Sequence, residues 1–162
     1  MKPALLVIDV QKEFFSSPTA SQSLNSAIEY INAAIELFRK KMLPIVCIQH
    51  VEQGLEPNTE GFGLPENLKI LPSDLHVQKT YGNSFNKTPL AEKLRELDVD
   101  TVIITGYEAE NCVLSTCRGA LDLDLTPIIL RGALASNHPE NIEFVERINS
   151  IISYGSLNRV LD

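Results

Sequence analysis

Short apolar stretches alternate with longer amphipathic ones along this chain. The most continuous apolar stretch covers residues 3–10, and a second covers residues 43–50. Stretches of this length and composition predict strands that are buried on both faces of a parallel sheet. Between them, apolar residues recur every three or four positions over residues 24–38. This spacing predicts a long helix with one apolar face, capped by Ser21 or Ser23.

The same alternation continues to the end of the chain. Residues 51–74 interrupt it with three glycines and three prolines, and we expect this irregular segment to form one wall of a pocket. Strands that alternate with helices predict a doubly wound, Rossmann-like α/β fold, here as one domain over residues 1–162. Further strands are predicted at residues 75–79, 101–105, 125–130 and 151–153, and further helices at residues 89–97 and 139–149.

Composition narrows the possible functions. The net charge of −7 and the pI of about 5.0 argue against binding to a nucleic-acid backbone, which requires a basic surface. The apolar stretches are too short to span a membrane, and the N-terminus enters a strand without a signal-peptide pattern. Three cysteines, an odd and low number, indicate a reducing, cytoplasmic setting. We therefore expect a cytoplasmic protein with no nucleic-acid or membrane partner.

Three reactive side chains lie at the predicted carboxyl ends of strands. Asp9 stands near the end of the first strand, Lys79 ends the third, and Cys112 follows the fourth. Ligands of doubly wound sheets bind beyond these ends, so the three residues are candidates for one site. Each also has a structural explanation, as a loop-capping carboxylate, a solvated lysine and a small residue at a tight turn. Cys47 and Cys117 are expected in the core.

The stretch around Cys112 has the features of a nucleophile site. Gly106 is expected to end the strand, and Cys112 then lies in the first turn of a helix, where free N–H groups and the helix dipole favour negative charge. This setting predicts a lowered thiol pKa. No histidine lies at a recognisable spacing from Cys112, so Asp9 is the expected base. The histidines are His50, His76 and His138.

Three motifs give the chain a resemblance to a known family. They are LLVIDVQKEF over residues 5–14, QKTYGNSF over residues 78–85 and GYEAENCVLST over residues 106–116. Together and in this order they resemble the isochorismatase-like cysteine hydrolases, which include nicotinamidases, N-carbamoylsarcosine amidases and biuret hydrolases. The resemblance runs nearly end to end and implies a three-layer α-β-α sandwich with a parallel sheet of about six strands. The catalytic triad that it implies is Asp9, Lys79 and Cys112.

The resemblance also implies a reaction. A cis peptide bond between Tyr107 and Glu108 would turn the N–H of Glu108 towards that of Cys112, and the two would form an oxyanion hole. Asp9 would take the thiol proton, the thiolate would attack a small amide, ureide or imide, and water would hydrolyse the thioester. Members are commonly oligomers, which implies a homodimer or tetramer. Aromatic side chains are expected as pocket walls, namely Phe14, Tyr81, Phe85 and Tyr107.

Two departures from the family pattern matter. Nicotinamidases carry Asp-x-His and a further His after the second strand, where this chain has Gln49-His50-Val51-Glu52. We therefore expect no catalytic metal, no other cofactor and a substrate other than nicotinamide. Many members also have a small residue at the position of Glu108. Two alternatives to an enzyme stay open: a binding protein without turnover, and a redox-responsive thiol protein, for which Cys112 and Cys117 are poorly spaced as a disulfide.

Overall fold

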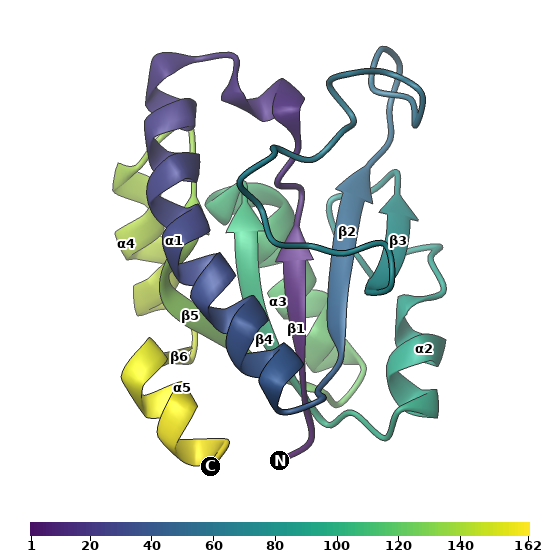
Figure 1. Cartoon of the computed structure of the whole chain (residues 1–162), viewed down its shortest axis with the longest axis vertical. Helices are drawn as coiled ribbons and strands as arrows, with labels where there is room; N and C mark the ends of the chain where they lie inside the picture. Colours follow the sequence, from purple (N-terminus) through teal and green to yellow (C-terminus); the bar gives the residue numbers. More distant parts are fainter.

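Six strands form a single parallel sheet in the order β3-β2-β1-β4-β5-β6 in the computed structural model, which describes residues 1–162 (Figure 1). The order runs outward from β1 in both directions, so the switch point lies between β1 and β4. This confirms the prediction of a doubly wound α/β fold with about six strands. The strands are β1 (Pro3–Ile8), β2 (Ile45–His50), β3 (Leu75–Lys79), β4 (Thr101–Tyr107), β5 (Thr126–Ala135) and β6 (Ile151–Ile152).

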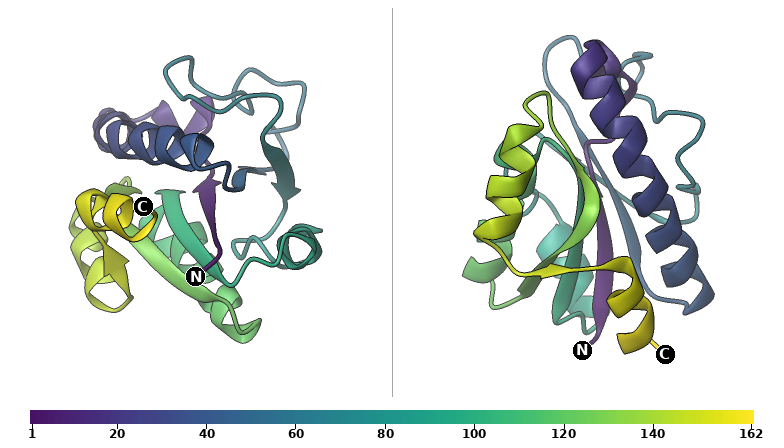
Figure 2. Two further views of the ribbon diagram at one scale, coloured as in Figure 1. Left: turned by 60° about the horizontal axis from the view of Figure 1, so that its bottom comes forward. Right: turned by 90° about the vertical axis from the view of Figure 1, so that its left-hand side faces the viewer.

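Helices cover both faces of the sheet and complete the three layers (Figure 2). Leu5 and Val7 of β1 pack on the face that carries α1 and α5. Leu6 and Ile8 pack on the opposite face, against α2, α3 and α4. Alternate residues of one strand therefore enter two separate cores, which explains why the strand is apolar throughout. The helices are α1 (Pro18–Lys40), α2 (Leu90–Glu96), α3 (Leu114–Asp122), α4 (Glu140–Arg147) and α5 (Tyr154–Val160).

The longest helix, α1, begins earlier than the sequence pattern indicates. Its N-cap is Ser17, whose Oγ accepts a hydrogen bond from the N–H of Ala20 at 3.0 Å, and Pro18 occupies the first helical position. The predicted caps Ser21 and Ser23 lie inside the helix, because its first turn is polar and shows little of the apolar face. No helix of the fold, α1 included, combines the length and the apolar composition that crossing a membrane requires.

Three further boundaries differ from the sequence prediction. β4 does not end at Gly106 but continues to Tyr107, because the glycine adopts a φ of +118° and the strand goes on pairing with β5. β5 extends to Ala135 after a shift in its register with β4. A final helix, α5, has no counterpart in the prediction, since Leu157 is its one buried residue and leaves no apolar periodicity.

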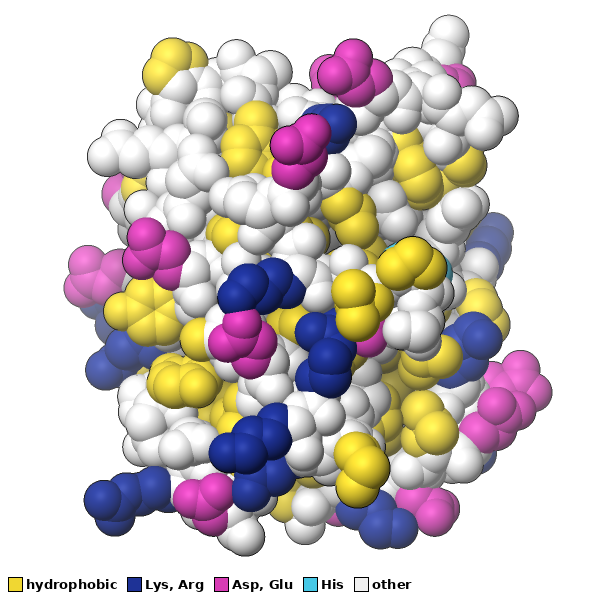
Figure 3. Space-filling model, viewed as in Figure 1, with side chains coloured by type: hydrophobic (Ala, Val, Ile, Leu, Met, Phe, Trp, Pro, Cys, Tyr) yellow, Lys and Arg dark blue, Asp and Glu magenta, His cyan; other side chains and the backbone are white.

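Residues 51–74 contain no helix or strand, and they run beside α1 and in front of β1 and β2 (Figure 1). Asn32 of α1 holds this segment by two hydrogen bonds, donating to the carbonyl of Asn67 at 2.7 Å and accepting from the N–H of Lys69 at 2.9 Å. On this face, basic and acidic side chains lie side by side (Figure 3). The end of the segment is therefore fastened to α1, and Glu52, near its start, is its one residue in the cavity described below.

Candidate active site

Asp9, Lys79 and Cys112 meet at the carboxyl edge of the sheet. Asp9 follows β1, Lys79 is the last residue of β3, and Cys112 lies in a π-helical turn, η2 (Ala109–Val113), between β4 and α3. Lys79 Nζ lies 2.8 Å from Asp9 Oδ2 and 3.3 Å from Cys112 Sγ. The structure thus brings together three residues that lie far apart in the sequence.

The ammonium of Lys79 is the centre of the hydrogen bonds in this site. The Lys79 side chain is fully buried, and a buried ammonium needs acceptors for its three protons. Besides Asp9 and Cys112, Nζ lies 3.1 Å from the carbonyl oxygen of Tyr81 and 3.2 Å from Nδ1 of His50. Four acceptors therefore surround three donors, which holds Nζ in one position.

His50 is a site residue that the sequence prediction missed. An ammonium can only donate, so Nδ1 of His50 accepts from Lys79, and we assign His50 as neutral with its proton on Nε2. The buried Gln11 holds the His50 backbone by donating to its carbonyl at 3.0 Å and accepting from its N–H at 2.7 Å. A polar residue that ends an apolar strand, the signal that selects Lys79, also marks His50. No sequence signal marks Gln11.

Asp9 is a buried carboxylate with one free oxygen. Its side chain is 3% exposed, Oδ2 contacts Lys79, and Oδ1 is buried without a hydrogen-bond partner. Burial raises the pKa of Asp9, and the charge of Lys79 opposes this shift. A buried acceptor without a donor is costly in a core and useful in a reaction site, where it can take a proton.

Burial also controls the Cys112 thiol. It raises the pKa of Cys112 to about 12; the charge of Asp9 raises this pKa further, and the charge of Lys79 lowers it. The lowered pKa expected from a helix N-terminus is therefore wrong, because desolvation of the sulfur outweighs the favourable dipole and cation. Cys47 and Cys117 are buried in the core as expected, and all three thiols are free.

The backbone between β4 and η2 has two special conformations. The peptide bond between Tyr107 and Glu108 is cis, at the position that the resemblance implies. Gly106 has a φ of +118°, and a Cβ on this residue would lie 2.0 Å from the carbonyl oxygen of Ile8. Glycine is therefore required here. The close approach sets the end of β4 directly against β1, one residue before Asp9.

A cavity of about 210 Å³ opens beside these groups. Phe14 and Tyr107, two of the predicted pocket residues, line it with rings stacked 4.9 Å apart at an interplanar angle of 25°. Tyr81 and Phe85, also predicted, do not line it: the Tyr81 ring is exposed near Lys87, and Phe85 packs against a core cluster. The lining residues are Asp9, Phe14, His50, Glu52, Tyr107, Glu108, Asn111 and Cys112.

Other parts of the molecule show no comparable chemistry. No group of three or more His, Cys, Asp or Glu side chains is arranged to hold a metal ion; the expectation that no metal takes part stays a prediction. Three larger hollows, two of about 450 Å³ and one of about 260 Å³, lie elsewhere and contain none of the reactive residues. The cavity beside Cys112 is therefore the candidate active site.

Comparison with known proteins identifies the family. The family model described as Isochorismatase domain matches residues 3–147. The chain is 32% identical over 139 residues to the uncharacterized isochorismatase family protein YrdC of Bacillus subtilis (strain 168), across 83% of this chain and 74% of that protein. The structure of an isochorismatase-like hydrolase from Alkaliphilus metalliredigens matches with a TM-score of 0.89 at 25% identity, over 100% of both chains.

Some of the relatives carry the names of enzymes. Nicotinamidase 3 of Arabidopsis thaliana is 28% identical over 134 residues, across 72% of this chain and 65% of that protein. The region of the family match runs from β1 to the end of α4, so it includes Asp9, Lys79 and Cys112. By its sequence and by its fold, the chain belongs to the isochorismatase family of hydrolases.

Proposed function

We propose that this protein hydrolyses the C–N bond of a small amide, ureide or imide through a thioester on Cys112. The observation that carries the proposal is that one buried ammonium, that of Lys79, contacts both the Asp9 carboxylate and the Cys112 sulfur at a cavity. Packing alone does not favour such a set, since apolar replacement of a buried ion pair is often stabilising. The similarity to Nicotinamidase 3, by its name an amidase, supports a C–N bond.

Asp9 acts as the base for the nucleophile. The raised pKa of Cys112 means that the resting sulfur is a neutral thiol, so its proton leaves as the attack proceeds. Oδ1 of Asp9 is the free acceptor for this proton, while Oδ2 stays with Lys79. The Lys79 ammonium, 3.3 Å from Sγ, stabilises the negative charge that develops on sulfur.

Backbone N–H groups would stabilise the tetrahedral intermediate. We assign this role to the N–H groups of Glu108 and Cys112, which border the cavity. Sulfur adds to the carbonyl carbon, the C–N bond then breaks, and the proton held by Asp9 passes to the leaving nitrogen. Water, deprotonated by Asp9, cleaves the thioester, which returns the proton to the Cys112 sulfur and releases the acid.

We also propose that the protein is a cytoplasmic homo-oligomer. Three free thiols suit a reducing compartment, and the family resemblance implies a dimer or a tetramer. Size-exclusion chromatography with light scattering tests the oligomer at micromolar concentration. A monomer of 18.0 kDa would contradict it.

Ammonia release from a panel of small primary amides, ureides and imides tests the hydrolase. Cys112→Ala is the blank, and Cys117→Ala is the matched control, because Cys117 is a fully buried thiol outside the cavity. We expect release that disappears in Cys112→Ala and persists in Cys117→Ala. Release that continues in Cys112→Ala would overturn the proposal. No release from any compound would favour a binding protein that keeps the fold without turnover.

A further inference from the structure

The cavity carries negative charge that no cation balances. Asp9 and Lys79 neutralise one another, and His50 is neutral because Lys79 donates to its Nδ1. Glu52 and Glu108 also line the cavity, and neither forms an ion pair with a lysine or arginine. Glu52 lies 3.8 Å from the neutral His50. Two carboxylates therefore face the space beside the reacting groups without a compensating charge.

Glu108 is held in place by neutral groups. Its Oε2 accepts from the side-chain amide of Asn111 at 2.6 Å, and its Oε1 accepts from the N–H of Asn137 at 3.3 Å. Both partners are uncharged, so they orient the carboxylate without removing its charge. Burial is the main cause that raises the pKa of Tyr107 to about 12, and the nearby charges of Glu108 and Glu110 raise it further.

The aromatic wall adds a second feature that suits a cation. Phe14 and Tyr107 stack against one another at the cavity, and the faces of aromatic rings attract cations within about 6 Å. Carboxylates beside aromatic rings recognise ammonium groups by charge and by ring quadrupole together. The cavity volume of about 210 Å³ limits the ligand to a small molecule, below the usual range of about 300–1,000 Å³ for larger ligands.

We propose that the substrate is a small amide that carries a positive charge at the end remote from its carbonyl, and that Glu52 and Glu108 select this charge. The proposal rests on the proposed function for the reacting end. There Asp9 lines the same cavity, and its Oδ1 is buried without a hydrogen-bond partner. The side chain of Glu108 thereby determines specificity, while its backbone N–H serves the oxyanion.

A pair of isosteric substrates isolates the charge. Trimethylammonioacetamide is a cation, 3,3-dimethylbutanamide is its neutral carbon analogue, and succinamate is an anion. We expect kcat/KM to favour the cation by about tenfold or more over the neutral analogue at low salt, since a charged cleft concentrates a substrate of opposite charge by this order. The preference should shrink as salt is added.

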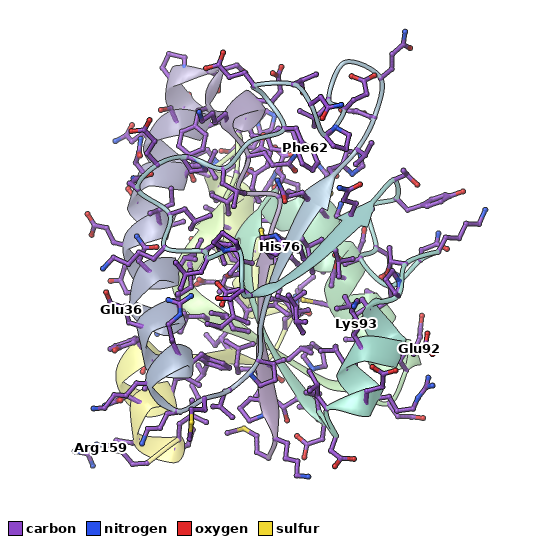
Figure 4. The ribbon with its side chains drawn as sticks, turned by 45° about the vertical axis from the view of Figure 1, so that its right-hand side comes forward. Glu36, Phe62, His76, Glu92, Lys93 and Arg159 are labelled. Atoms are coloured by element: carbon purple, nitrogen blue, oxygen red, sulfur yellow. The ribbon has the colours of Figure 1, made fainter.

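Variants separate the site from the intrinsic reactivity of the cationic amide. In Glu52→Gln/Glu108→Gln we expect the cation-to-neutral ratio of kcat/KM to fall by about tenfold, whatever the change in kcat/KM for the neutral amide. The intrinsic reactivity of each amide is the same with every variant. A change in the cation-to-neutral ratio of kcat/KM between variants therefore reports on the site alone. Glu92→Gln is the matched control, since Glu92 is exposed on α2 at the side of the molecule (Figure 4). A ratio that stays the same in the double variant would overturn the proposal.

A measurement without turnover keeps the two proposals apart. Cys112 is the one thiol outside the core, and it can be modified with 2-(trimethylammonio)ethyl or 2-sulfonatoethyl methanethiosulfonate, with Cys112→Ala as the blank. We expect the cationic reagent to react about tenfold faster after correction for the rates with glutathione, and the advantage to disappear in the double variant. If no amide is hydrolysed, the proposed hydrolase activity is contradicted. If the two reagents react at equal rates, only the proposed charge selection is contradicted.

Discussion

Lys79 Nζ donates a hydrogen bond to Nδ1 of His50 across 3.2 Å, between the last residues of two neighbouring strands. The two residues are direct partners in the register of β2 and β3. This contact gives the Lys79 ammonium an acceptor from a residue that the sequence analysis did not select. His50 is a positioning residue: it holds the ammonium that in turn contacts Asp9 and Cys112.

Replacement of His50 tests this positioning. His50→Ala removes one acceptor, so the ammonium can move away from the sulfur, and we expect kcat to fall by about tenfold with little change in KM. His50→Asn places Oδ1 near the position of Nδ1 and should restore most of kcat. His76→Ala is the control, because His76 lies exposed on β3 (Figure 4). Equal activity of the Ala and Asn variants would contradict the role.

The buried pair of Asp9 and Lys79 should show in stability. Lys79→Met leaves the Asp9 charge without its cation, and we expect the free energy of unfolding at pH 7 to fall by about 3–5 kcal/mol. The loss should shrink as the pH falls, because the raised pKa of Asp9 lets the carboxyl take a proton. Urea denaturation of each variant measures these changes.

Two further variants control this stability experiment. Asp9→Leu/Lys79→Met removes both charges and should recover most of the lost stability. Lys2→Met removes a partner of Asp98 in an exposed ion pair and should cost at most about 1 kcal/mol. A double variant as unstable as Lys79→Met would show that the pair contributes packing rather than charge compensation.

The raised thiol pKa predicts slow alkylation and alkaline instability. At pH 8, iodoacetamide should modify Cys112 about tenfold or more slowly than free cysteine, without a plateau below pH 11, because the thiolate is scarce. Labelling that reaches a plateau between pH 6 and 8 would contradict the raised pKa of Cys112.

The same thiol should make the protein less stable at alkaline pH. The folded pKa of about 12 lies above the ordinary value of 9.0, so the contribution of the protonated thiol to stability is complete below pH 9 and is lost as the pH rises towards 12. Cys112→Ala should weaken this loss.

Gly106 should tolerate no side chain. In Gly106→Ala the new Cβ would meet the backbone of Ile8 at a positive φ, and we expect a loss of stability on the order of 3 kcal/mol or more. Gly155→Ala is the matched control, since a Cβ there meets nothing within 4 Å and the residue lies in α5. It should change stability by less than about 1 kcal/mol. Urea denaturation compares the two, and similar midpoints would contradict the prediction.

Local patterns account for most of the fold and part of the site. The continuous apolar stretches identify β1 and β2, since strands that enter two cores need apolar side chains on both faces. The polar ends of β1 and β3 identify Asp9 and Lys79. The same patterns do not find α5 or the extension of β5, because these elements form through pairing and packing that leave little local periodicity.

The order of residues along the chain was enough to predict the doubly wound fold, the family, and the meeting of Asp9, Lys79 and Cys112 at one edge of the sheet. Packing in three dimensions was needed to find the raised pKa of Cys112, the contact of His50 with Lys79, and the choice of Phe14 and Tyr107 over Tyr81 and Phe85 as cavity walls. These properties depend on distances across strands, which control desolvation and the contacts between side chains. A spacing along the chain sets which end of a strand a residue occupies, but the packed layers set how much water reaches it.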